Sequence, residues 1–217
     1  MHLTQIEVNP RRRGTQPLLA SPHRLHGAVN ACFPPSGREG RILWRLDETN
    51  RGLLLYLLST TTPDAKGFVE QYGWDVDGSW QTRDYAPVLA SVVDRAVFSF
   101  RLRANPTHSV RTAKSDEDAP TKRIGHVTAD QQRRWLVKRA EAWGISIGDP
   151  DQPTFDVVER KVWQFNRSGK RVTISTATYE GQLTVANAGA FKDRLVSGFG
   201  PAKAYGCGLL TLAPARQ

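Results

Sequence analysis

Residues 155–179 have the sequence FDVVERKVWQFNRSGKRVTISTATY, and this stretch decides the fold. Two runs rich in β-branched and aromatic residues, 155–165 and 170–179, lie on either side of the turn sequence Asn-Arg-Ser-Gly at residues 166–169. This pattern predicts a β-hairpin. The elements around the hairpin show whether it stands alone or belongs to a larger unit.

Helices are predicted on both sides of the hairpin. Thr128 is a good N-cap for the first of them. The predicted elements around the hairpin are a strand at 122–127, a helix at 128–143, a short strand at 182–185, a helix at 187–197 and a strand at 205–212. The second half of the chain therefore has the order β-α-β-β-α-β.

The first half repeats this order. Its first helix begins at Ser21-Pro22, an N-cap followed by proline at the first helical position, and Pro34-Pro35 ends it. The other predicted elements are strands at 2–8, 41–46, 53–58 and 96–102 and a helix from 62 to 72, with a loop at 73–85. The expected fold is α+β, with two tandem ferredoxin-like (RRM-like, βαββαβ) domains. A polar linker at 105–121 divides them into residues 1–106 and 107–217.

The charge of the chain favours polyanionic partners. The 217 residues include 30 Lys and Arg against 21 Asp and Glu, which gives a formal charge of +9. Such a surplus favours nucleic acid or an anionic membrane as a partner, although a basic protein without such a partner is the alternative. The apolar run Leu53–Leu58 is far too short to span a bilayer, and no signal peptide is apparent. We expect a cytoplasmic protein with no membrane partner.

Several catalytic motifs are absent from the sequence. It contains no His-Glu-x-x-His, no paired Cys-x-x-Cys, no Walker loop and no Gly-x-Ser-x-Gly. The two cysteines, Cys32 and Cys207, lie far apart and suggest neither a disulfide framework nor a zinc site. Metal-dependent hydrolysis and serine-nucleophile chemistry are disfavoured, and we expect no metal and no cofactor.

Two of the five histidines, His23 and His26, lie three residues apart on the first predicted helix. At 100° per residue they project from one face together with Asn30. Histidine suits proton transfer near neutral pH because its pKa is close to 6.5. RNA carries its own nucleophile, the 2′-OH, so two imidazoles could act as base and acid without a metal. The alternative is a pair of solvated histidines, or one that caps a local hydrogen bond.

Two basic segments are candidates for RNA binding. The hairpin carries Arg160, Lys161, Arg167, Lys170 and Arg171. A basic hairpin of this kind can lie against phosphates, although a solvated strand face is the alternative. Near the C-terminus, residues 198–208 read GFGPAKAYGCG, in which Gly198, Gly200 and Lys203 could cradle a phosphate. A tight connection between helix and strand is the alternative there.

The sequence resembles a known family along its whole length. Residues 198–214 resemble the closing glycine-rich segment of CasE proteins, the CRISPR RNA-processing endoribonucleases of type I-E systems. Residues 98–106, FSFRLRANP, resemble their Phe-Arg-Leu-Arg-Ala-Asn-Pro strand. Leu25-His26 is similar to their Leu/Met-His motif, and residues 179–183 match an aromatic-Glu-Gly-x-Leu element.

The resemblance implies a function. It implies binding of a CRISPR repeat RNA hairpin and metal-independent cleavage of precursor CRISPR RNA on its 3′ side, which leaves 5′-OH and 2′,3′-cyclic phosphate or 3′-phosphate ends. The cut guide would stay in an antiviral complex with the other protein subunits of a type I-E Cascade. The catalytic histidine of the family maps onto His26, the basic residues of its hairpin onto Arg160 and Lys161, and its glycine-rich loop onto residues 198–208, including Lys203.

The chain also departs from the family pattern. Many members carry tyrosine where this chain has His23, so we expect His23 to assist His26 as a partner or an orienting group. Some members place a lysine later in the helix to stabilise the charged phosphorane, and here the sequence is Asn30-Ala31-Cys32. Either another cation takes that role or the chemical step is slower. Two other functions stay open: a non-catalytic RNA-binding subunit, and an enzyme that binds a phosphorylated metabolite at the glycine loop.

Overall fold

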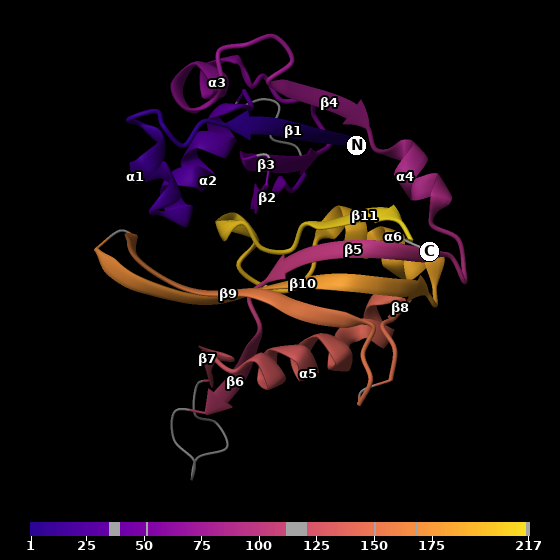
Figure 1. The fold of residues 1–217 in the computed structure, drawn as a ribbon. Coiled ribbons are helices and arrows are strands. Elements are labelled where there is room, and N and C mark those ends of the chain that lie inside the picture. Colours follow the sequence, from indigo (N-terminus) through magenta and orange to yellow (C-terminus); the bar gives the residue numbers. More distant parts are fainter. Residues whose placement is uncertain (35–39, 51, 112–120, 150, 168, 216–217) are drawn as a thin grey trace.

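The structure, a computed structural model, describes residues 1–34, 40–50, 52–111, 121–149, 151–167 and 169–215. The described chain forms two antiparallel sheets, one above the other in Figure 1, and a separate two-stranded ribbon. The centre of the expected linker at 105–121 and Ser168 of the predicted turn lie outside the described residues.

The first sheet has the strand order β4-β1-β3-β2. Its strands are β1 (His2–Val8), β2 (Leu43–Thr49), β3 (Gly52–Ser59) and β4 (Trp80–Asp84). The helices of this half are α1 (Thr15–Leu19), α2 (Pro22–Ala31) and α3 (Lys66–Tyr72). Along the chain, β1, α2, β2, β3, α3 and β4 give the predicted order β-α-β-β-α-β.

The second sheet has the order β11-β5-β10-β8, with β9 also paired to β10. Its strands are β5 (Val97–Ala104), β8 (Ile145–Ser146), β9 (Phe155–Arg167), β10 (Lys170–Val185) and β11 (Leu210–Pro214). The helices are α4 (Ala86–Ser91), which follows β4, α5 (Ala129–Ala140), α6 (Ala188–Ser197) and the short 3₁₀ helices η2 (Glu141–Trp143) and η3 (Lys203–Tyr205). In Figure 1, α5 lies below this sheet.

Strand pairing corrects several predicted elements. The prediction that the strand at 96–102 closes the first unit is wrong: β5 pairs with β10 and β11 and begins the second unit. The first unit closes with β4, in the segment expected to be a loop. The strand predicted at 122–127 is β7 (Thr121–Gly125), which pairs with β6 (Thr107–Arg111) in the separate ribbon. We therefore propose a domain division between β4 and β5 in place of the one expected at residues 106 and 107.

The strand predicted at 182–185 is the end of β10, and the strand predicted at 205–212 begins only at Leu210. Strand β10 continues through Gly181. The lack of a side chain at this glycine lets the backbone of Thr154 come close, since a Cβ there would lie 2.2 Å from the carbonyl oxygen of Thr154. The long hairpin of β9 and β10 is confirmed, as are the N-caps of α2 and α5. The hairpin extends far beyond the second sheet, and Figure 1 shows its far end below α1 and α2.

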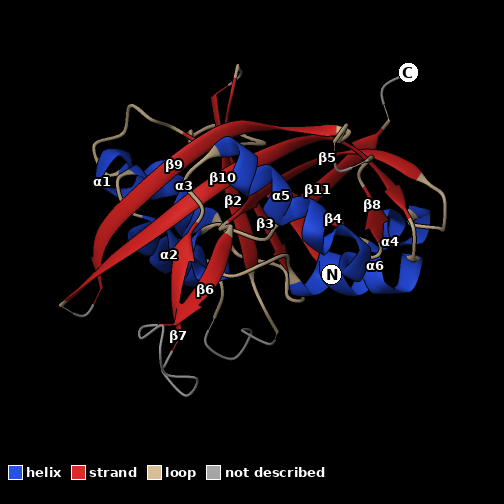
Figure 2. Ribbon diagram, turned by 90° about the horizontal axis from the view of Figure 1, so that it is seen from below, coloured by secondary structure: helices blue, strands red, loops and turns tan. Residues whose placement is uncertain are grey.

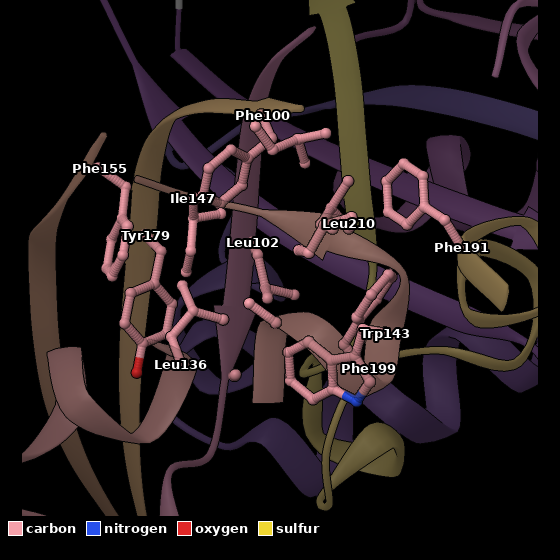
Figure 3. Close-up of a cluster of buried hydrophobic side chains, with 14 of the residues drawn as sticks. Phe100, Leu102, Leu136, Trp143, Ile147, Phe155, Tyr179, Phe191, Phe199 and Leu210 are labelled. Carbon is pink, nitrogen blue, oxygen red and sulfur yellow. The ribbon is translucent and has the colours of Figure 1, made fainter. Parts of the chain in front are cut away.

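Each half has its own hydrophobic core. The larger core lies in the second half, where aromatic rings from β9, β10, η2 and α6 meet the aliphatic side chains of β5 and α5 (Figure 3). Trp143 packs edge-on against Phe199 with 5.1 Å between ring centroids. A third, smaller cluster contains Leu43 and Leu58 of the first sheet together with Leu209, which precedes β11. The two halves are therefore packed against each other through apolar side chains.

A buried ion pair also joins the two sheets. Arg45 on β2 is 1% exposed and donates to the carbonyl oxygens of Arg101 at 2.8 Å and Leu209 at 2.9 Å. Its charge is balanced by Asp47, two residues along β2. Because both acceptors belong to the second half, this pair fixes β2 relative to β5 and β11. Figure 2 shows the strands from below, with α5 crossing the second sheet.

Candidate RNA-processing site

The first predicted catalytic element is α2. The Ser21 side chain accepts a hydrogen bond from the backbone N–H of Arg24, and Pro22 occupies the first turn. Leu25 and Val29 are buried in the core of the first half and fix the rotation of the helix. His26 is consequently half-buried at the edge of the packed face, whereas His23 is exposed.

His26 lies in a cationic and partly desolvated environment. Its Nε2 is 3.2 Å from Nδ2 of Asn30, one turn later, as the predicted shared face requires. Within the part of the chain that the structure describes, its buried Nδ1 has no hydrogen-bond partner. Burial lowers the pKa of His26, and the positive charges of His23 and Arg167 lower it further. The neutral imidazole therefore predominates near neutral pH.

The hairpin presents different residues on its two faces, because side chains alternate along a strand. One face carries Lys161, Trp163, Phe165 and Arg167. Lys161 Nζ lies 3.9 Å from the centroid of the Trp163 ring, and Phe165 packs against Tyr205 with ring centroids 5.0 Å apart. Lys170 is directly opposite Arg167 in the strand register and shares this face. This is the face that is turned towards η3 and α2.

The opposite face carries Arg160 and Arg171. Arg160 donates to the carbonyl oxygen of Val127 at 3.2 Å, at the start of α5, and Arg171 hydrogen-bonds Gln164. The structure therefore separates the five basic residues that the sequence grouped together. Lys161, Arg167 and Lys170 lie on the face of His26, and the other two lie on the far face.

The glycine-rich segment is packed tightly against both halves. Gly198 has φ of 82°, and a Cβ there would lie 2.7 Å from Leu43 and 2.8 Å from Lys203. Gly200 has φ of 71° and faces the Trp135 ring. Lys203 donates to the carbonyl oxygen of Gly200 at 2.8 Å, and burial, followed by the charges of Arg41 and Arg194, lowers its pKa. Backbone conformation and close packing explain why glycine occupies positions 198 and 200. A role of these glycines in holding phosphate stays a prediction.

Tyr205 connects these elements, and the sequence analysis did not select it. It ends η3, which lies against α2, and its hydroxyl accepts a hydrogen bond of 3.0 Å from Nη1 of Arg167. Its position inside the glycine-rich segment was the only signal in the sequence. Arg41, which acts on Lys203, was also missed.

The described residues contain no group of three or more His, Cys, Asp or Glu side chains arranged to hold a metal ion. None of the described helices is both long and apolar enough to cross a membrane. A cleft of about 1030 Å³ lies between α1, α2 and α3, and its lining includes Arg24, Gly27 and Ala31. It belongs to the outer side of α2 and does not include His23 or His26.

Comparison with known proteins identifies the family. A family model described as CRISPR associated protein matches residues 1–214. The CRISPR-associated endoribonuclease Cse3 of Thermus thermophilus is 30% identical over 229 residues, which covers 99% of this chain and 100% of the relative. The chain belongs to the Cse3/CasE family of CRISPR-associated proteins.

Two further relatives agree with this assignment. The Cascade subunit CasE of Escherichia coli K12 is 33% identical over 119 residues, covering 53% of this chain and 57% of that protein. A solved structure of the endoribonuclease Cse3 bound to a 19-nucleotide RNA superimposes with a TM-score of 0.81 at 27% identity, covering 99% of this chain and 100% of that one. The predicted resemblance to CasE and the tandem ferredoxin-like fold are both confirmed.

Proposed function

We propose that this Cse3/CasE family member binds a CRISPR repeat RNA hairpin and cleaves precursor CRISPR RNA on the 3′ side of the stem. Family membership and the RNA-bound relative support the choice of substrate. The observation that carries the proposal is His26: a partly buried imidazole with a lowered pKa, beside a hairpin face that presents Lys161, Arg167 and Lys170. An acid–base group and phosphate-binding cations therefore occur together.

The chemistry needs no metal in this proposal. A base removes the proton of the 2′-OH, the 2′-oxygen bonds to the adjacent phosphorus, and the bond from phosphorus to the 5′-oxygen breaks as that oxygen is protonated. The products carry a 2′,3′-cyclic phosphate and a 5′-OH. His26 acts as base or acid, and His23 is its partner or an orienting group. The groups that hold the stem and the scissile phosphate are Arg160, Lys161, Arg167, Lys170, Arg171, Lys203 and the backbone at Gly198 and Gly200.

The cut RNA is proposed to stay bound within a Cascade complex. The E. coli relative is itself described as a Cascade subunit. The other subunits of such a complex are therefore the protein partners that we propose.

The test uses purified protein in EDTA with a hairpin RNA of the host repeat and an analogue with 2′-deoxyribose at the cut site. We expect wild type to cut the RNA at one position and to leave the analogue intact. His26→Ala should cut about 10²-fold or more slowly with nearly unchanged affinity, because one acid–base catalyst is lost. His108→Ala is the matched control, since His108 lies on β6 and stacks on His126, which follows β7, and Figure 1 shows this ribbon away from α2. Binding without cleavage in all samples would indicate an RNA-binding subunit, and neither binding nor cleavage would favour the metabolite enzyme.

A further inference from the structure

Helix α2 does not supply a cation for the reaction from its own side chains. The only Lys or Arg between Pro22 and Ala31 is Arg24. Arg24 is two residues from His26, about 200° around the helix, and it lines the cleft on the outer side. The phosphorus centre gains negative charge as the 2′-oxygen attacks, and a preorganised cation at that point stabilises the transition state. In this chain the cation must come from another element.

Arg167 is held where such a cation is needed. It is the last residue of β9, at the far end of the hairpin, and its Nη1 donates to the Tyr205 hydroxyl at 3.0 Å. Phe165, on the same face, packs on the Tyr205 ring. Because η3 rests on α2, the side chain of Tyr205 fixes the hairpin tip relative to the catalytic helix. The charge of Arg167 also acts on His26 directly, since it contributes to the lowered pKa of that imidazole.

The arrangement leaves donors for a substrate. A guanidinium has five N–H donors in a planar fork that matches two phosphate oxygens, and the bond to Tyr205 uses one of them. The Tyr205 hydroxyl accepts this bond, so its own proton remains available. Lys203 is a less suitable donor, because it is bonded to the carbonyl oxygen of Gly200 and lies among other cations.

We propose that Arg167 is a catalytic residue that donates to the non-bridging oxygens of the scissile phosphate and stabilises the phosphorane, and that Tyr205 is the residue that positions it. The inference rests on the proposed cleavage function.

The test measures single-turnover cleavage with protein in excess over RNA, so that rate at saturation and affinity are separated. Removing one donor to a developing oxyanion costs about 10²–10³-fold in rate, and we expect Arg167→Ala to lose about this much at saturation. Arg167→Lys should recover part of the rate, and added guanidinium ion should partly rescue Arg167→Ala, which a purely structural role would not allow. Tyr205→Phe should lower the rate less than Arg167→Ala does, and the conservative change keeps the packing on Phe165.

Two comparisons make the result specific. Arg134→Ala removes the same charge from the exposed surface of α5, where Arg134 pairs with Asp130, and the saturated rate should stay near that of wild type. In Arg167→Ala the inflection of the pH–rate profile that depends on His26 should move to higher pH, because a positive neighbour that lowers the pKa of His26 is gone.

The outcomes separate this inference from the function on which it rests. If wild type does not cut, or if His26→Ala cuts as fast as wild type, the cleavage function itself fails. If cleavage depends on His26 but Arg167→Ala loses only affinity and matches wild type at saturation, the role of Arg167 is overturned. A loss of saturated rate that guanidinium restores, with an upward shift of the pH profile, supports it.

Discussion

Nη2 of Arg45 lies 2.8 Å from Oδ2 of Asp47, and the two side chains are only 1% and 4% exposed. Arg101 approaches the other carboxylate oxygen at 3.3 Å, and Arg101 is in turn paired with Glu180. The same strand, β2, places Leu43 against Gly198 and Trp44 against Gly206. Through the hydrogen bonds of Arg45 and the packing of Leu43 and Trp44, β2 links the first half of the chain to the second sheet and to the glycine-rich segment.

Asp47→Asn should strongly destabilise the fold. The substitution leaves Arg45 buried with its charge uncompensated, and breaking a buried pair in this way costs about 3–5 kcal/mol. Denaturant unfolding followed by circular dichroism gives the free energy of unfolding. Asp130→Asn is the control, because Asp130 pairs with Arg134 on the exposed surface of α5 and such a pair contributes at most about 0.5 kcal/mol. Equal losses in the two variants would contradict the assigned role of Asp47.

Stability should fall in acid partly through Asp47. Burial opposes ionisation of this carboxyl, but the hydrogen bonds and charge of Arg45 outweigh burial, so its pKa lies below the ordinary value. A carboxyl with a lowered pKa in the folded state contributes stability above its unfolded pKa of about 3.9, and this contribution is lost as the pH falls through the folded pKa. Unfolding free energies measured between pH 7 and pH 3 should therefore decline below about pH 4 in wild type. Asp47→Asn should decline less over the same interval.

How far the fold follows from the sequence depends on whether local patterns carry the information. The hairpin, the N-caps of α2 and α5, and the helix at 187–197 were predictable, since turn residues, cap residues and apolar spacing are all local. The strands with which β5 pairs were not predictable. Alternation of buried residues shows that a strand has one buried face, but it does not show which sheet the strand joins. The segment Trp80–Asp84 resembles a loop in sequence because its composition is mostly polar.

The candidate site was predictable in its residue types and not in its geometry. Spacing marks His23 and His26 as a pair, the resemblance to CasE proteins selects His26, and composition marks the basic hairpin. Only the structure shows that Arg167 faces His26 whereas Arg171 does not, because that depends on the strand register. Tyr205 was missed since its role depends on a contact between residues 38 positions apart in the chain.

The two faces of the hairpin should differ in RNA binding. Lys161 shares the face of Arg167, and Arg160 is turned towards the start of α5. Each phosphate contact that is removed lowers the slope of log affinity against log salt by about 0.7–0.9. We expect Lys161→Ala to lower the slope by about this amount and Arg160→Ala to lower it less, as measured by binding titrations at several salt concentrations. A slope unchanged in both variants would argue against the hairpin as an RNA contact.

Gly206 offers a test of the packing that positions Tyr205. Its φ is 76°, and a Cβ there would lie 2.6 Å from the Trp44 ring, which is buried in the core of the first half. Gly206→Ala therefore adds two costs: about 1–2 kcal/mol for a left-handed alanine, and the displacement of a buried indole.

Gly169→Ala separates these two costs. Gly169 has nearly the same φ, 75°. Among the described residues, no atom beyond its chain neighbours lies within 4 Å of the position that a Cβ would take there, so this variant carries the backbone cost without the clash. We expect Gly206→Ala to be clearly less stable than Gly169→Ala in denaturant unfolding, and the difference measures the contact with Trp44. Because Tyr205 precedes Gly206, the same variant should also lose saturated cleavage rate, whereas Gly169→Ala should lose little. Equal stability in both variants would mean that the Trp44 indole moves aside at no cost. The packing of the glycine-rich segment would then not fix the position of Tyr205, nor that of Arg167, which is bonded to it.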